Sequence, residues 1–288
     1  MKILFAIPHY FDPSGGGRHG SLAADPRPRL QALSACLAAL HHVYGQEQKQ
    51  IDIARRVVTP ANQGQRHEID IVICTTGDRR LLGQLPIAGQ LYWHRNGTAE
   101  PRFLGLECRQ AFRDLLGKYD YYAYLEDDLV LTDPWFFHKL AWFTRLAGDH
   151  RVLQPNRFEM LNHVVARKVY VDGDLRPDVY RPFCDPDALP IIEGEFLGMP
   201  IAFRPARNPH SGCYFLNAAQ MEHWAAQPDF LERDASFVGP LESAATLGIL
   251  RTFEVYKPAR EQAAFLEIQH FGSQFLELVG TKLPIIDE

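Results

Sequence analysis

The strongest constraint on the fold is an aromatic stretch, residues 119–125, that ends in three consecutive carboxylates, Glu126, Asp127 and Asp128. Aromatic and apolar residues in such a run are typical of a buried β-strand, and Gly117 just before them is typical of the end of a helix. Adjacent carboxylates repel one another, and a hard divalent cation is the simplest physical reason to place them together. The pattern therefore predicts a buried strand that ends at a metal site. The competing interpretation is a solvated acidic turn before the next helix.

Strand-like and helix-like patterns alternate along the first half of the chain. Residues 2–7 form an apolar run that stops at Pro8, and apolar residues then recur at helical spacing over 30–44. A second apolar run, 69–74, ends in polar residues, as strands do where α/β sheets bind ligands. We therefore predict an α/β fold with a mixed, mostly parallel sheet flanked by helices, built as a single domain over residues 1–288.

The second half has a different character. Prolines interrupt every periodic pattern in residues 154–210, which predicts an irregular, proline-rich lobe inserted over the sheet. Regular structure is expected to resume with a strand at 213–216 and with a helix that begins at Pro240 and carries Glu242 in its first turn.

Composition excludes several classes of protein. A hydrophobic content of 46% in 288 residues is enough for a large core, while a net charge of −5 and a pI near 6.2 argue against nucleic-acid binding. The five cysteines are odd in number, which fits a reducing compartment. Because no apolar run approaches membrane-spanning length, we expect a cytoplasmic protein with no transmembrane segment and at most a peripheral contact with the inner face of the membrane.

The run Tyr-Asp-Tyr-Tyr-x-Tyr-Leu-Glu-Asp-Asp resembles the Asp-x-Asp region of the metal-dependent GT-A fold glycosyltransferases, which use nucleotide-sugar donors. The strand-loop-helix start, the second strand ending in Thr-Thr-Gly-Asp, a late helix-borne acid and a histidine near the C-terminus follow in the same order. The resemblance spans roughly residues 1–275. It implies a GT-A fold with a nucleotide-sugar-binding half, 1–150, and an acceptor-binding and catalytic half, 151–288.

The same resemblance implies roles for the acids. Glu126 takes the first acidic position, near the ribose; Asp127 either contributes or points away; and Asp128 binds the metal directly. His270 resembles the histidine that completes the metal shell, with His210 as the second candidate. The implied cofactor is Mn²⁺ or Mg²⁺, and an imidazole ligand suits Mn²⁺ better.

Glu242 is the candidate catalytic base. In inverting GT-A enzymes the base tends to lie at a helix start, some 25 to 30 residues before the metal-binding histidine, and Glu242 matches that spacing to His270. It would remove the proton from the acceptor hydroxyl. An acid at a helix start also stabilises the helix dipole, which is the simpler explanation. Glu193 and Glu195 are the rival bases.

The residues expected to contact the donor nucleotide follow the first two strands: Pro8, His9, Tyr10, Asp78 and Arg79. Arg79, Arg18 and Lys257 could pair with a diphosphate, because guanidinium and ammonium groups suit phosphate oxygens. The resemblance favours a UDP-sugar as donor and a glycan or glycoconjugate as acceptor, and it implies a place in polysaccharide biosynthesis.

Two other functions fit the same residues. A metal-dependent nucleotidyltransferase also places carboxylates after a strand, but it releases pyrophosphate or a nucleoside monophosphate. A Ca²⁺-dependent carbohydrate-binding module would hold Ca²⁺ on the acids and sugar in the lobe 154–210, without turnover.

Overall fold

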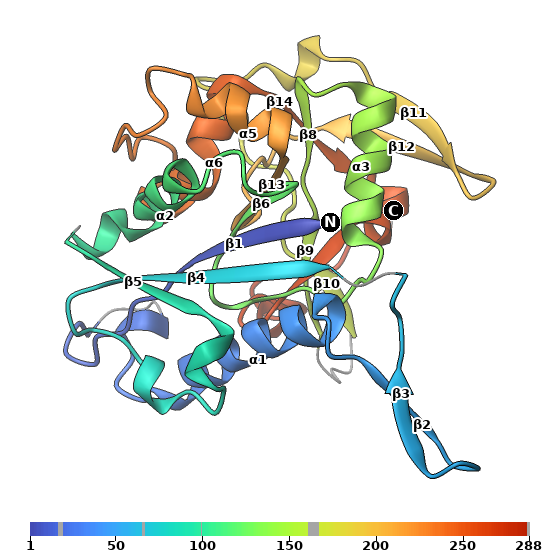
Figure 1. Ribbon diagram of the computed structural model, residues 1–288. Helices are drawn as coiled ribbons and strands as arrows, with labels where there is room; N and C mark the ends of the chain where they lie inside the picture. The colour runs from blue at the N-terminus through green and yellow to red at the C-terminus, as the bar shows by residue number, and fades with distance from the viewer. Residues whose placement is uncertain (17–19, 65–66, 99, 161–166, 287–288) are drawn as a thin grey trace.

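A computed structural model of the chain describes residues 1–16, 20–64, 67–98, 100–160 and 167–286. Within these residues a five-stranded sheet lies at the centre of the molecule (Figure 1). Its spatial order is β13 (Cys213–Asn217), β6 (Tyr121–Leu125), β1 (Lys2–Pro8), β4 (Glu68–Thr76) and β5 (Trp93–Gly97). All pairs are parallel except that of β13 with β6.

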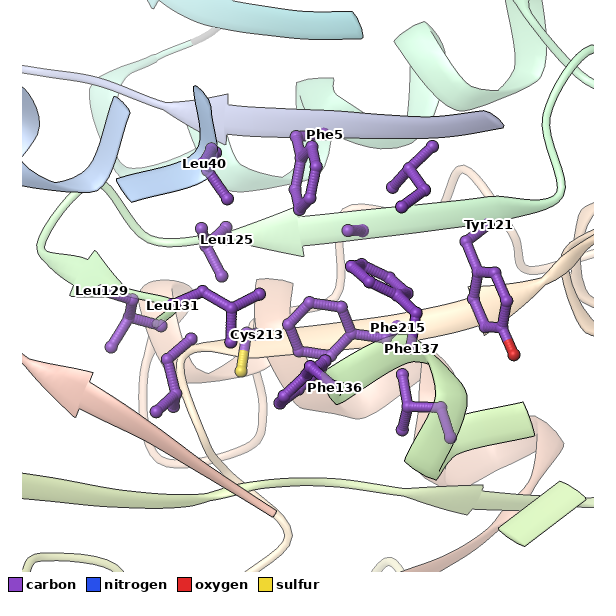
Figure 2. Packing of buried hydrophobic residues seen from close by; sticks show 14 of the residues in the cluster. Phe5, Leu40, Tyr121, Leu125, Leu129, Leu131, Phe136, Phe137, Cys213 and Phe215 are labelled. Atoms are coloured by element: carbon purple, nitrogen blue, oxygen red, sulfur yellow. The ribbon is translucent and has the colours of Figure 1, made fainter. Parts of the chain in front are cut away.

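Helices cover both faces of this sheet, which confirms the predicted α/β fold class. They are α1 (Arg27–Tyr44), α2 (Leu104–Asp114), α3 (Phe136–Ala147), α4 (Pro177–Tyr180), α5 (Ala218–Ala225) and α6 (Pro240–Thr252). Side chains alternate along a strand, so Ile3 and Phe5 of β1 pack on α1 and α3, whereas Leu4 and Ala6 pack on α2, α5 and α6. Figure 2 shows the first of these layers, in which Phe5, Phe137 and Phe215 meet.

Two smaller sheets lie beside the central one. The second sheet has the order β10 (Lys168–Tyr170), β9 (Asn156–Met160), β15 (Glu267–His270) and β7 (Leu129–Val130). The third has the order β11 (Ile192–Phe196), β12 (Met199–Pro205), β14 (Glu254–Pro258) and β8 (Arg151–Leu153). The lobe 154–210 is thus more regular than its prolines predict, since it contributes strands to both sheets. A hairpin of β2 (Lys49–Asp52) and β3 (Val57–Pro60) projects from the body (Figure 1).

Local hydrogen bonds set the start of two helices. α3 begins at Phe136, because Asp133 accepts the backbone N–H of Trp135 in a turn before it. His270 ends β15, which follows a 3-10 helical segment, Arg260–Phe265. Asn217 caps α5 through a reciprocal pair of hydrogen bonds with Gln220. No helix among the described residues is long and apolar enough to cross a bilayer.

Candidate functional site

The three carboxylates lie at the corner where the chain passes from the central sheet to the second sheet. β6 ends at Leu125, the acids form a turn in which the N–H of Leu129 donates to the carbonyl of Glu126 (3.1 Å), and β7 follows at once. The parallel strands β1, β4 and β6 end at the same edge. The predicted gathering of polar residues at these strand ends is therefore present.

Asp127 points inward and joins three elements. Its Oδ2 accepts the Nδ1 proton of His9 at 2.5 Å, and its other oxygen contacts the guanidinium of Arg29 in α1. The N–H of Leu81 donates to Nε2 of His9 (3.0 Å), so the imidazole proton must be on Nδ1. His9 and Asp127 are fully buried. The donor contact expected of these two residues stays a prediction; what the structure shows is that they tie β1 and β6 to α1.

Asp128 is less enclosed and faces His270. Its Oδ2 accepts a hydrogen bond from Nη1 of Arg29 (2.9 Å) and lies 3.9 Å from Nε2 of His270, a residue 142 positions away in sequence. Its Oδ1 is buried without a hydrogen-bond partner among the described residues. Burial raises the pKa of the Asp128 carboxyl, but the charges of Arg29 and His270 outweigh burial and hold it below its usual value.

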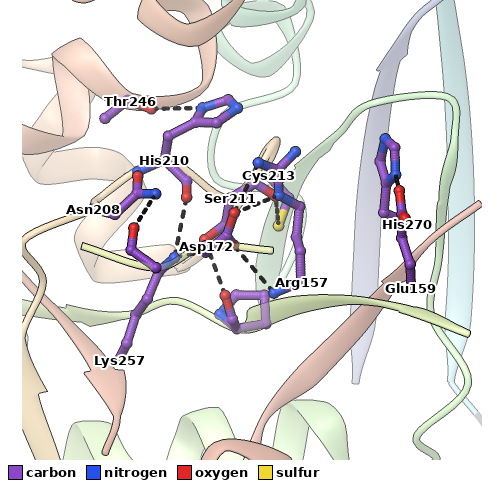
Figure 3. A network of polar contacts seen from close by, with 12 residues as sticks. Arg157, Glu159, Asp172, Asn208, His210, Ser211, Cys213, Thr246, Lys257 and His270 are labelled. Atoms are coloured by element: carbon purple, nitrogen blue, oxygen red, sulfur yellow. Dashed lines mark hydrogen bonds and ion pairs between the residues drawn. The ribbon is translucent and has the colours of Figure 1, made fainter. Parts of the chain in front are cut away.

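Sheet register brings His270 to Asp128. β15 pairs with β7, so that His270 lies opposite Leu129, and the N–H of Phe271 donates to the carbonyl of Asp128 (2.8 Å). Nδ1 of His270 hydrogen-bonds Oε1 of Glu159 at 2.8 Å, which leaves Nε2 directed at Asp128 (Figure 3 shows the His270–Glu159 pair). Burial lowers the pKa of His270, but the bond to Glu159 and the charge of Asp128 raise it above its usual value.

Glu126 has a third environment. Its N–H donates to the carbonyl of Gly212 (3.0 Å), and its carboxylate lies so close over that glycine, whose φ is +62°, that a Cβ there would come within 2.6 Å of Oε2. Burial and the neighbouring charge of Asp128 raise the pKa of Glu126 to about 7. A cation or a hydroxyl group placed here would meet a carboxyl that changes its protonation near neutral pH.

A buried ion-pair cluster lies beside the acids (Figure 3). Asp172 accepts Nε and Nη2 of Arg157 at 2.9 and 2.8 Å, and Nζ of Lys257 at 3.1 Å. Lys257 also donates to the carbonyl of His210 (3.1 Å), whose ring contacts Thr246 (3.2 Å). Lys257 is thus already paired, which corrects the expectation that it is free for a diphosphate. Burial and the charge of Arg157 lower the pKa of His210 to about 3, so the ring is neutral.

Tyr10 after β1 and Asp78 and Arg79 after β4 lie nearer the surface than His9 does. Arg79 contacts the hydroxyl of Tyr10 (3.0 Å) and pairs with Asp12 (2.7 Å), and Pro8 ends β1 beside them. Asp78 has a side chain that is 98% exposed and pairs with Arg80 at 3.1 Å. Arg18 lies outside the described residues.

Glu242 occupies the third position of α6, as predicted, and its Oε2 lies over the start of the helix at Gly239. Thr246, one turn later on the same side of α6, touches His210. Through His210 this face of α6 is connected to the buried ion-pair cluster. Neither Glu242 nor the rival acids on β11 make a described contact with Asp128 or His270.

The pair of Asp128 and His270 fits a divalent metal ion in part. Two ligands that each lie about 2.1 Å from one ion can be up to about 4.2 Å apart, and the observed separation is 3.9 Å. The unpartnered Oδ1 of Asp128 and the carboxylate on the far nitrogen of His270 are what such a ligand pair needs. No three His, Cys, Asp or Glu side chains come together around one point in the described ranges. The remaining ligands would have to be phosphate oxygens or water, and Arg29 would have to shift.

Sequence reasoning missed Arg29, Glu159 and Arg157. Arg29 lies within the predicted helix of α1, and the helical pattern gives it no special role. A cation in the first turn of a helix opposes the helix dipole, and this is the signal that distinguishes Arg29. Glu159 lies between Phe158 and Met160 in a strand, and a carboxylate in an apolar strand is the signal that could have found it.

No family model and no curated protein sequence matches this chain. Among solved structures, residues 1–349 of TarS from S. aureus align with 9% identity and a TM-score of 0.45, covering 95% of this chain and 61% of that one. A longer S. aureus TarS structure gives 10% identity and a TM-score of 0.43, covering 95% of this chain and 37% of that one. A CMP:2-keto-3-deoxy-manno-octonic acid synthetase complexed with CTP aligns with 11% identity and a TM-score of 0.40, covering 89% of this chain and 90% of that one. This chain thus spans less than two thirds of the TarS chains. At these TM-scores the function has to be argued from the site itself.

Proposed function

We propose that this chain is a metal-dependent GT-A glycosyltransferase that moves a sugar from a nucleoside-diphosphate donor, with a UDP-sugar favoured, to a hydroxyl of a glycan or glycoconjugate. The observation that carries the proposal is the juxtaposition of Asp128 and His270, with the far nitrogen of the histidine held by a buried carboxylate. These residues lie at the edge of the sheet where the parallel strands end. A metal ion that binds phosphate explains this arrangement better than a solvated acidic turn does.

Asp128 and His270 would hold Mn²⁺ or Mg²⁺, which when bound neutralises charge on a departing nucleoside diphosphate. Glu126, whose carboxylate lies over Gly212, would contact the ribose or a sugar hydroxyl. Glu242 would take the proton from the acceptor hydroxyl, which makes the transfer inverting. It reaches an acceptor only if that acceptor lies between α6 and the acids.

The donor base and diphosphate would lie across the ends of β1 and β4. Tyr10 and Pro8 offer flat surfaces there, and Arg79 offers a guanidinium on the molecular surface. Asp78 would accept the N3 proton of a uracil ring, since its carboxylate is exposed and Arg80 is its one partner among the described residues. Arg29 carries the positive charge nearest to Asp128 and is the second candidate for a phosphate oxygen.

Titration calorimetry with UDP, GDP and dTDP, each with Mn²⁺ and with EDTA, tests the proposal. We expect one nucleotide to bind in the presence of Mn²⁺ and to lose that binding in EDTA. Binding of none of them, together with binding of Ca²⁺ and a glycan, would move the function to a carbohydrate-binding module. Turnover of a nucleoside triphosphate with release of pyrophosphate would identify a nucleotidyltransferase.

The base is tested by Glu242→Gln, which keeps the size of the side chain but cannot accept the acceptor proton. We expect donor binding to stay within twofold of wild type and kcat to fall by about 10²- to 10⁴-fold. Glu222→Gln, on the exposed face of α5, is the matched control and should leave both unchanged. Near-normal turnover of Glu242→Gln would remove Glu242 from the mechanism.

A further inference from the structure

Glu159 is a fully buried carboxylate whose acceptor sites are all directed at one short segment. Its side chain is 0% exposed on β9. Oε2 accepts the backbone N–H groups of Phe275 (2.9 Å) and Leu276 (2.8 Å), and Oε1 pairs with Nδ1 of His270 (2.8 Å). A buried carboxylate is costly unless hydrogen bonds replace its water, and here all three replacements come from residues 270–276.

The pairing of β9 with β15 in the second sheet places the Glu159 carboxylate next to the imidazole of His270. β9 and β15 run parallel in a register that sets Ile268 beside Arg157 and Gln269 beside Phe158, so the next step brings His270 beside Glu159. The ring of Phe275 packs edge-on to the imidazole at 5.7 Å. Glu159 holds one edge of the imidazole (Figure 3). Phe275 lies beside the ring, and Nε2 is left to face Asp128.

We infer that Glu159 is a positioning residue of the metal site: it keeps the proton of His270 on Nδ1, so that the lone pair on Nε2 points at the position beside Asp128 where the metal ion binds. This inference rests on the proposed function, because it concerns the ligand pair assigned there. A histidine ligand needs its other nitrogen fixed in this way, since the ring otherwise has two tautomers and free rotation.

The variant Glu159→Gln tests the inference sharply. An amide has one oxygen, and that oxygen is needed by the two backbone N–H groups of Phe275 and Leu276. The amide NH₂ then faces Nδ1 of His270 and donates to it, which moves the ring proton to Nε2 and removes the lone pair that would bind the metal. The segment stays anchored while the ligand is lost.

The readout is the Mn²⁺ affinity of the full chain with UDP present, measured by titration calorimetry or by the electron paramagnetic resonance signal of free Mn²⁺. We expect Glu159→Gln to weaken Mn²⁺ binding by about 10- to 100-fold. In a His270→Ala background the same change should have no further effect. Glu254→Gln on β14 is the control: it replaces a carboxylate that pairs with Arg151 of β8, and the variant should bind Mn²⁺ as wild type does.

A second measurement uses the wild-type protein, so it tests the inference even if Glu159→Gln folds poorly. Nitrogen NMR of the metal-free wild-type protein at alkaline pH should show His270 with its proton on Nδ1. A proton on Nε2, or Mn²⁺ affinity unchanged in a folded Glu159→Gln variant, would overturn the inference while the proposed function stands. If wild type binds no Mn²⁺ with any nucleotide, the proposed function and the inference both fall.

Discussion

At the scale of single residues, three consecutive carboxylates have three different environments. Successive side chains in the turn after β6 point in different directions: Asp127 enters the protein, Asp128 faces His270 and Glu126 lies over Gly212. Only Asp127 is fully buried, with a histidine and an arginine as partners. We therefore expect neighbouring substitutions to have unlike effects.

The first prediction compares Asp127→Ala with Asp128→Asn. Removal of the Asp127 carboxylate leaves the buried ring of His9 without its partner and leaves Arg29 with Asp128 alone, and we expect a loss of about 3–5 kcal/mol in the free energy of unfolding. Asp128→Asn should unfold near the wild-type urea midpoint but lose Mn²⁺-dependent UDP binding. Each variant is the control for the other. If Asp127→Ala were as stable as wild type, the contacts of Asp127 with His9 and Arg29 would not contribute to the free energy of unfolding.

The second prediction concerns pH and His67. This ring packs among Tyr44, Phe137 and His138, and neither of its nitrogens has a hydrogen-bond partner among the described residues. Burial, with the nearby N-terminal amine, lowers the pKa of His67 to about 4. In the unfolded chain the pKa is about 6.5, so the unfolded state binds a proton first as the pH falls.

Stability should therefore fall as the pH drops from about 6.5 to about 4, and His67→Leu should make that decline shallower. The measurement is the urea midpoint at a series of pH values. His223→Leu, at an exposed position on α5, should leave the slope as in wild type. Equal slopes in all three proteins would show that His67 does not titrate in this window.

At the scale of elements, the β2–β3 hairpin contrasts with the β11–β12 hairpin. All residues of β2 and β3 are exposed or partly exposed, and Ile51 pairs with Val58 on a face that is open to solvent. β12 instead carries the buried side chains of Ile201 and Phe203. The two hairpins have similar sequence patterns, because each combines β-branched or aromatic residues with a turn.

Replacing residues 49–60 by a short Gly-Ser linker should change the free energy of unfolding by less than about 0.5 kcal/mol, because no buried surface is lost. The same replacement of residues 192–203 should destabilise the protein by several kcal/mol, since two core side chains are removed. Urea unfolding measures both. Strong destabilisation by the first replacement would mean that the β2–β3 hairpin packs on a partner surface in solution.

At the scale of the whole molecule, Asp172 connects the two smaller sheets. Arg157 belongs to β9 of the second sheet and Lys257 to β14 of the third, and both donate to this one carboxylate. Burial raises the pKa of Asp172, but the charges of Lys257 and Arg157 outweigh it and bring the pKa to about 2. The carboxylate is therefore ionised in the folded protein throughout the ordinary pH range.

Asp172→Asn should cost about 3–5 kcal/mol of unfolding free energy near neutral pH, because two buried cations lose their counter-charge. The contribution of Asp172 in wild type is present above a pH of about 4, the ordinary pKa of an aspartate, and is lost as the pH falls toward 2. Asp174→Asn, two residues away with an exposed side chain, is the control. The difference between the two variants should shrink in urea melts at acidic pH; a constant difference would contradict the assignment.

The amino-acid sequence by itself determined the α/β class, the strands β1, β4 and β6, the helices α1 and α6, and the edge at which polar residues gather. These follow from local chemistry: the period of apolar residues, a proline or glycine at an element end, and the rule that parallel strands end together. It also selected Asp128 and His270, which lie together. It did so through the family resemblance rather than through spacing.

Only the tertiary structure decided which polar residues are partners. Asp78 beside Gly77 and Asp172 beside Gly173 look alike in sequence, yet one is open to solvent and the other neutralises two buried cations. Pairs such as Arg29 with Asp128 and Glu159 with His270 are separated by 99 and 111 residues. Their contact depends on strand order and register, which arise when whole faces pack together and which no local pattern encodes.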